Sequence, residues 1–138
     1  QEGRTIAASL PRVNFFHWVM IDIPATPAEL AEGSCSNGIT PGGKTAPNGP
    51  AGSRQGINDY TGFMANDPDM AGDYFGYDGP CPPWNDSIPH HYRFKLFALN
   101  TQRLELDDNF TALDAMRALR KHVVDQVELT GTYSLAPA

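Results

Sequence analysis

The chain has 138 residues, with 16 acidic and 10 basic side chains and a formal charge of −6 at neutral pH. A length of this order predicts a single domain, residues 1–138. The scattered basic residues exclude a stripe for nucleic-acid binding, and no apolar run approaches the roughly 20 residues of a membrane-spanning helix.

The first predicted element is a strand over residues 13–23, because aromatic and β-branched residues occur throughout it. Both faces of this strand are largely apolar, so we expect it to be buried. Prolines end the strand, and Thr26 can cap a short helical turn over residues 27–30. Residues 32–58 and 64–85 are rich in turn-forming residues and predict two irregular loops, which at this length are usually functional or mobile.

Residues 89–99 predict the clearest strand, since apolar and charged side chains alternate along most of it. An amphipathic helix is expected over residues 111–125, with Thr111 and Asp114 in the arrangement of a capping box. Its apolar stripe consists of Leu113, Met116, Val123 and Val124, with Leu119 at its margin. Residues 127–133 return to the alternation of a strand.

The two cysteines, Cys35 and Cys81, are too few for a disulfide framework. Both lie in Gly/Pro-rich loops where a bridge is geometrically feasible, but free thiols in a reducing compartment are the default. The first residues lack the basic start and apolar core of a signal peptide, although a removed peptide would leave no trace. We therefore expect a cytoplasmic protein, with the periplasm as the alternative.

Five short motifs follow one another in a fixed order. They are His17-Trp18, Asn58-Asp59-Tyr60, Gly76-Tyr77-Asp78-Gly79-Pro80-Cys81-Pro82-Pro83, His90-His91-Tyr92-Arg93-Phe94 and Leu129-Thr130-Gly131-Thr132-Tyr133. This ordered set resembles the phosphatidylethanolamine-binding protein family, in its bacterial branch often called Raf-kinase-inhibitor-like proteins. The resemblance implies a mainly β fold, an antiparallel two-sheet β-sandwich with a helix near the C-terminus. It also implies a homodimer.

The resemblance further implies a pocket for the phosphate of a phospholipid head group or a similar small anion. His17 and His90 match the pocket imidazoles, Gly79 and Cys81 match the backbone wall, and Tyr92 matches a wall residue with a hydroxyl donor. The candidate ligand-binding residues are His17, Gly79, Cys81, Pro82, Pro83, His90 and Tyr92.

One part of the family pattern is missing. The family carries an Asp-Pro-Asp-x-Pro segment upstream of the His-Trp motif, and its first acid belongs to the pocket. The residues before His17 contain no such segment, and the similar Asp67-Pro68-Asp69 lies downstream, so we interpret it as a decoy. We therefore expect the N-terminal strands of the family fold to be cleaved off, on a separate chain or absent.

The residues themselves support the same chemistry. A histidine at the start of a strand can donate hydrogen bonds to an oxyanion, and a bound anion favours its protonated form. Taken alone, His17 is better interpreted as a packed core histidine, and His90 is interpreted equally well as a turn residue bonded to a carbonyl. His91 alternates away from His90 and is expected to face solvent, and His122 reads as a surface or packing residue.

Other chemistries are weaker in this sequence. The acids between Asp67 and Asp78 echo a calcium loop, but Ala71 occupies a ligand position. A zinc site of His17, His90 and Cys81 lacks local ligand spacing, and no general base is identified for a Cys81 nucleophile. We therefore expect a non-enzymatic binding protein without a cofactor; the alternative is a protein-interaction regulator, of a kinase or protease, that uses the loop over residues 32–58.

Overall fold

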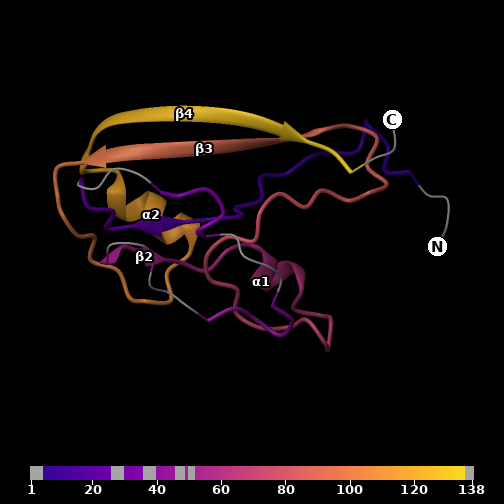
Figure 1. The fold of residues 1–138 in the computed structure, drawn as a ribbon, viewed down its shortest axis with the longest axis horizontal. Coiled ribbons are helices and arrows are strands. Elements are labelled where there is room, and N and C mark those ends of the chain that lie inside the picture. Colours follow the sequence, from indigo (N-terminus) through magenta and orange to yellow (C-terminus); the bar gives the residue numbers. More distant parts are fainter. Residues whose placement is uncertain (1–4, 26–29, 36–39, 46–48, 50–51, 136–138) are drawn as a thin grey trace. The chain divides into compact units, whose positions relative to one another are not determined.

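The computed structural model describes residues 5–25, 30–35, 40–45, 49 and 52–135 of the chain (Figure 1). Its internal contacts divide the chain into two compact units. Unit 1 contains the described residues within 1–14, 80–98 and 125–138, and unit 2 contains those within 15–79 and 99–124. The single domain over residues 1–138 stays a prediction.

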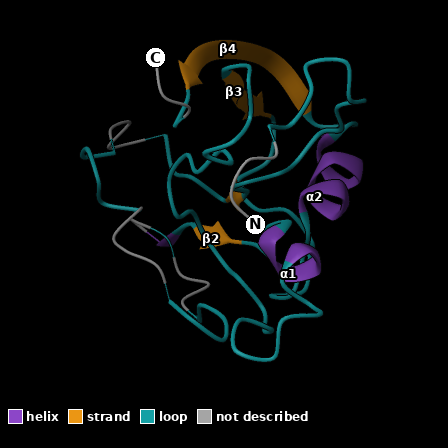
Figure 2. Cartoon of the chain, turned by 90° about the vertical axis from the view of Figure 1, so that its right-hand side faces the viewer, coloured by secondary structure: helices purple, strands orange, loops and turns teal. Residues whose placement is uncertain are grey.

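Two antiparallel sheets and two helices form the regular structure of the described residues, and loops join them (Figure 2). The elements in chain order are β1 (Met20–Ile21), β2 (Arg54–Gln55), α1 (Tyr60–Phe63), β3 (His90–Leu99), α2 (Ala112–Leu119) and β4 (Val123–Tyr133). β1 pairs with β2, and β3 pairs with β4. Strands predominate over helices, as the sequence predicted. Within the described residues, neither helix has the length and apolar character needed to cross a bilayer.

The first predicted strand is much shorter than expected. Only β1 forms a regular antiparallel ladder, with β2 as its partner. Upstream of β1 the chain is attached by separate hydrogen bonds, from the Gly56 amide to the Val19 carbonyl (3.0 Å) and from the Asp59 amide to the Phe16 carbonyl (2.9 Å). The prediction of a continuous strand over residues 13–23 was therefore wrong, because β2 ends after two residues and α1 begins soon after it.

The two predicted loops are largely irregular where they are described. The loop over residues 32–58 contains β2, and the loop over residues 64–85 contains neither helix nor strand. α1 between them was not predicted. The helical turn over residues 27–30 and its cap Thr26 lie outside the described residues, apart from Leu30.

The buried hydrophobic side chains of the described chain lie in unit 2. They are Ile21, Tyr74, Phe75, Leu104, Phe110, Ala112, Ala115 and Leu119. α2 contributes three of them, spaced so that they share one helical face. The predicted stripe was wrong in part: Leu113 is 56% exposed and Val124 is 65% exposed and lies in β4. The helix is also shorter than predicted, because β4 begins at Val123.

A buried ion pair joins the core elements of unit 2. Arg54 Nε donates to Asp22 Oδ2 (2.7 Å), and both side chains are nearly inaccessible to solvent. The Arg54 guanidinium also donates to the carbonyls of Leu106 (2.7 Å) and Leu104 (2.8 Å). Asp22 Oδ1 accepts from the Leu104 amide (2.8 Å). One arginine thus satisfies backbone groups that no sheet or helix partner reaches.

β3 and β4 run side by side in opposite directions in Figure 1. Arg93 Nε lies 3.8 Å from Glu128 Oε1, so the two strands are joined by an exposed ion pair as well as by their backbones. Large apolar side chains are exposed on both strands, at alternating positions along each. They are Phe94 and Leu96 in β3, and Val127, Leu129 and Tyr133 in β4.

Candidate functional site

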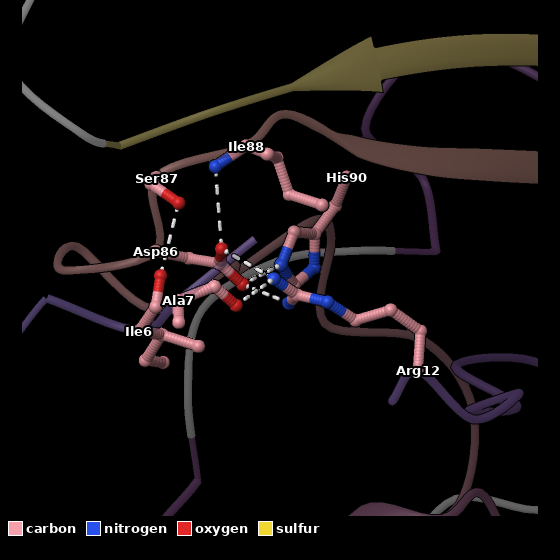
Figure 3. A network of polar contacts seen from close by, with 7 residues as sticks. All are labelled: Ile6, Ala7, Arg12, Asp86, Ser87, Ile88 and His90. Carbon is pink, nitrogen blue, oxygen red and sulfur yellow. Dashed lines mark hydrogen bonds and ion pairs between the residues drawn. The ribbon is translucent and has the colours of Figure 1, made fainter. Parts of the chain in front are cut away.

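A buried carboxylate in unit 1, Asp86, holds together two side chains that can carry positive charge (Figure 3). Both Nη atoms of Arg12 donate to it, Nη1 to Oδ2 and Nη2 to Oδ1 at 3.0 Å. His90 Nε2 lies 2.7 Å from Oδ2, and the Ile88 amide donates to Oδ1 at 3.2 Å. The Asp86 side chain is only 2% exposed, so its charge is compensated by hydrogen bonds and not by bulk water.

Local structure explains how Asp86 reaches this position. Its amide donates to the Pro83 carbonyl (3.1 Å), and its side chain accepts from the amide two residues later, which is the geometry of an Asx turn. The N-terminal segment is attached by the bond from the Ile6 amide to the Asn85 carbonyl (2.8 Å) and by Ser87 Oγ, which donates to the Ile6 carbonyl (2.9 Å). This attachment brings the segment that carries Arg12 to the turn.

The network keeps Asp86 ionised. The hydrogen bonds from Arg12, and then that from His90, lower the pKa of the Asp86 carboxyl well below its ordinary value, against the opposing effect of burial. The bond to Asp86 also raises the pKa of the Arg12 guanidinium, which is charged at any physiological pH. Unit 1 therefore contains a fixed carboxylate with a bidentate guanidinium and an imidazole on it.

His90 is the predicted site residue that this network orders. Its side chain is 31% exposed, and its ring faces the Tyr92 ring at a centroid distance of 6.5 Å, with 29° between the planes. His91, the next residue, is exposed, as the strand alternation predicted. His90 and Tyr92 thus lie together at the start of β3.

His17 lies in unit 2 among aromatic rings. Its imidazole centroid is 4.8 Å from that of Phe15 and 5.5 Å from that of Tyr60, and the residue is half-buried. A hollow of about 490 Å³ opens nearby beside Phe15, Asn58 and Phe63, but no predicted site residue lines it. His17 belongs to a different unit from His90, so its assignment to one pocket with His90 stays a prediction.

The predicted wall begins at a turn that Lys44 supports. Lys44 Nζ donates to the Tyr77 carbonyl (3.1 Å) and to Asp78 Oδ1 (3.0 Å), just before Gly79. Gly79 has φ +81°, a conformation that favours glycine, and a side chain there would meet open space. Of the remaining wall residues, Pro82 is buried, and Cys81 and Pro83 are exposed.

Sequence reasoning missed Asp86 and Arg12. Asp86 has a local signal, because it precedes His90 by four residues across a turn that ends in a proline. Arg12 has none, since 74 residues separate it from Asp86. Only the folded attachment of the N-terminal segment identifies it.

The competing metal and thiol readings gain no support from the described residues. The Asp67 carboxylate caps its own turn by accepting from the Asp69 (2.9 Å) and Met70 (3.2 Å) amides. No group of three metal-ligating side chains occurs in the part of the chain that the structure describes. Cys35 is half-buried and Cys81 is exposed, and both are free thiols in this structure.

The profile of one protein family, "Phosphatidylethanolamine-binding protein", matches residues 7–134. The chain therefore belongs to the phosphatidylethanolamine-binding protein family, as the ordered motifs predicted. The crystal structure described as that of E. coli YbcL, a new member of the mammalian PEBP family, matches the fold with a TM-score of 0.61 and 30% identity. That match covers 87% of this chain and 61% of YbcL.

Curated relatives are similar over most of this chain. The UPF0098 protein YbcL of Escherichia coli is 30% identical over 121 residues, which are 88% of this chain and 55% of that protein. A UPF0098 protein of Methanothermobacter thermautotrophicus is 33% identical over 117 residues, 85% of this chain and 61% of that protein. The chain thus spans between half and two thirds of the length of these relatives, whose names state no activity.

Proposed function

We propose that this protein binds a small tetrahedral oxyanion, the phosphate of a phospholipid head group or of a similar molecule, without transforming it. The observation that carries the proposal is the buried Asp86 carboxylate with Arg12 and His90 on it. Membership of the family supports the same chemistry, and the ligand class named here goes beyond that membership.

The charges of the network favour an anion. With His90 protonated, two cationic side chains surround one carboxylate, so the cluster carries a net positive charge within an acidic protein. The Arg12 and His90 side chains are 36% and 31% exposed, which leaves part of each open to solvent. Because Asp86 already fixes them, an incoming oxyanion meets ordered donors and little further entropy is lost.

The remaining residues of the proposed site come from the family resemblance. Tyr92 adjoins His90 on β3 and is proposed as a wall residue. The turn at Gly79 and the stiff segment that follows it are proposed as the backbone wall, with His17 as the second imidazole. The proposed set remains His17, Gly79, Cys81, Pro82, Pro83, His90 and Tyr92.

Titrations with inorganic phosphate and with phosphoethanolamine, followed by the NMR signals of the histidine rings, test this function. We expect the His90 signals to move with saturation, and tighter binding of phosphoethanolamine would identify a head group as the preferred source. His90→Ala should abolish the response. His91→Ala is the matched control, because His91 is exposed on the opposite face of β3. If neither ligand moves the His90 or the His17 signals, the proposed function is wrong.

The interaction-regulator alternative stays a prediction, and the structure changes its test. Ser53, Arg54 and Gln55 of the loop over residues 32–58 are buried, so deleting the loop would remove part of the core. Substitutions in its exposed residues 40–42 would separate partner loss from unfolding. The cytoplasmic location and the homodimer also stay predictions.

A further inference from the structure

We propose that Asp86 fixes the tautomer of His90, so that binding of an oxyanion at this imidazole is coupled to the uptake of a proton. The proposal rests on the proposed function and deepens it. It assigns Asp86 a positioning role at the site and predicts how pH regulates binding.

The hydrogen bond between Asp86 and His90 has a fixed direction. An ionised carboxylate has no proton to give, so it can only accept hydrogen bonds. The other partners of Asp86, the Arg12 guanidinium and the Ile88 amide, also donate to it. Asp86 therefore remains a carboxylate that accepts every one of its hydrogen bonds. At 2.7 Å from Oδ2, His90 Nε2 must therefore be the donor. Neutral His90 is thus held in the tautomer with its proton on Nε2.

The other ring nitrogen of His90, Nδ1, changes its role when the ring is protonated. With the proton on Nε2, Nδ1 of the neutral ring has only a lone pair, which repels an oxyanion. Nδ1 becomes a donor when the ring takes up a second proton. An oxyanion at Nδ1 and this proton therefore stabilise each other, and each must raise the affinity for the other by the same factor.

Arg12 and Asp86 keep their charges, so the imidazole of His90 is the group of this network that can take up a proton. Arg12 stays charged, and the lowered pKa of Asp86 keeps that carboxylate ionised over the range in which imidazoles titrate. β4 pairs with β3 and carries the titratable residues Asp125, Glu128 and Tyr133. On β3 itself, Tyr92 lies on the face of His90, whereas His91, Arg93 and Lys95 alternate to the opposite face.

The tautomer can be measured without any ligand. Long-range nitrogen–proton NMR correlations of the histidine rings, recorded at a pH where His90 is neutral, distinguish the two tautomers. We expect the proton on Nε2 of His90 in the wild-type chain. A proton on Nδ1 would overturn the proposal, whatever the protein binds.

The coupling is measured with sulfate, whose own charge is constant between about pH 5 and about pH 8, the range in which imidazoles titrate. Calorimetry in buffers of different ionisation enthalpy should show uptake of about one proton per sulfate where the ring is neutral. Over that range the affinity should fall by up to about tenfold per pH unit as the pH rises. Sulfate binding without proton uptake would contradict the coupling.

Asp86→Asn should reverse the tautomer. The amide oxygen can still accept from Arg12, which leaves the amide NH₂ to donate to Nε2 and places the ring proton on Nδ1. Neutral His90 then becomes a donor to the anion, so the pH dependence of sulfate affinity should flatten. Asp69→Asn removes an exposed carboxylate outside the network and should keep the wild-type pH dependence.

These outcomes separate the proposal from the function on which it rests. If the wild type holds the Nε2 tautomer but binds neither sulfate nor phosphate, the proposed function and the proton coupling fail, and only the positioning by Asp86 survives. If Asp86→Asn does not fold, Asp86→Glu replaces it. Glu keeps an accepting carboxylate, so this variant should restore both the Nε2 tautomer and the proton uptake, and loss of either in the folded variant would contradict the proposal.

Discussion

At the scale of single residues, two buried carboxylates support different parts of the chain. Asp86 organises Arg12 and His90 in unit 1, and Asp22 anchors Arg54 in unit 2. In both cases the partner includes an arginine, whose planar fork can bind a carboxylate and further acceptors together. The two networks differ in exposure, because Arg12 and His90 remain partly open whereas the Arg54 side chain is only 8% exposed.

The Asp86 network predicts a loss of stability in acid. The pKa of Asp86 is lowered in the folded chain, and an unfolded aspartate titrates near pH 4. The contribution to the free energy of unfolding is thus present above about pH 5 and is lost as the pH falls through 4 and below. Asp86→Asn removes this contribution. The free energy of unfolding, measured by urea denaturation, should therefore differ less between pH 6 and pH 3 in the variant than in the wild type.

Part of the acid dependence should survive in that variant, because hydrogen bonds from the Thr111 backbone and side chain also lower the pKa of Asp114. Asp69→Asn, outside both networks, should leave the wild-type difference intact. Equal acid dependence in the wild type and in Asp86→Asn would show that the Asp86 bonds do not form in solution.

The Arg54 network predicts a large effect of one substitution. Arg54→Met removes the partner of a buried Asp22 carboxylate and the donors to two backbone carbonyls. Breaking a buried pair in this way typically costs about 3–5 kcal/mol of unfolding free energy. Urea denaturation of the variant and the wild type would measure this loss.

Arg93→Met is the matched control for that substitution. Its partner Glu128 lies 3.8 Å away, and the two side chains are 66% and 44% exposed. An exposed pair contributes about 0–1 kcal/mol, so this variant should unfold near the wild-type midpoint. Similar losses for the two variants would contradict the buried role of Arg54.

At the scale of elements, the start of α2 follows from a local capping motif, whereas its end depends on the strand β4 that comes after it. Thr111 and Asp114 form the predicted capping box: Thr111 Oγ1 accepts from the Asp114 amide (3.3 Å), and Asp114 Oδ2 accepts from the Thr111 amide (3.0 Å). The capping motif is local and therefore readable from the sequence. The C-terminal end is set by β4, whose partner β3 lies more than twenty residues earlier in the chain.

Thr111→Ala tests the cap. The substitution leaves the Asp114 amide without its acceptor and should lower the unfolding free energy by about 1 kcal/mol. Thr111→Ser keeps the hydroxyl and should retain most of the stability. Hydrogen exchange at the Asp114 amide gives an independent measurement, and unchanged protection in Thr111→Ala would show that the cap does not form.

At the scale of the whole molecule, unit 2 is built from two separated stretches of chain, residues 15–79 and 99–124. The later stretch supplies Leu104, Phe110, Ala112, Ala115 and Leu119, five of the eight buried hydrophobic residues in the described part of the chain. The first stretch alone cannot bury the rest of this core.

A fragment of residues 1–98 should therefore fail to fold. It retains β1, β2, α1 and all of β3 except Leu99, but it lacks most of the buried hydrophobic residues of unit 2. Urea titration followed by tryptophan fluorescence should show no cooperative transition for the fragment and a sigmoidal one for the full chain. A cooperative transition in the fragment would contradict the dependence of unit 2 on its second stretch.

Local patterns predicted the elements that local chemistry determines. Strict alternation identified β3, the capping box identified the start of α2, and the ordered motifs identified the family. The predictions from sequence failed where contacts between residues far apart in the chain determine the structure. Residues 13–19 resemble a buried strand, yet no ladder forms there, and the Arg12–Asp86 contact spans 74 residues. A single sequence carries no signal for such pairings.

The alternation of side chains along the β3–β4 hairpin makes this hairpin sensitive to the register in which its strands pair. In β4, the exposed Val127 and Leu129 alternate with Glu128. Because side chains alternate with a period of two, one residue inserted early in β4 would move each of these side chains to the other face of the strand relative to β3. An insertion of two residues would restore the alternation. Odd insertions in this strand should therefore be far more damaging than even ones.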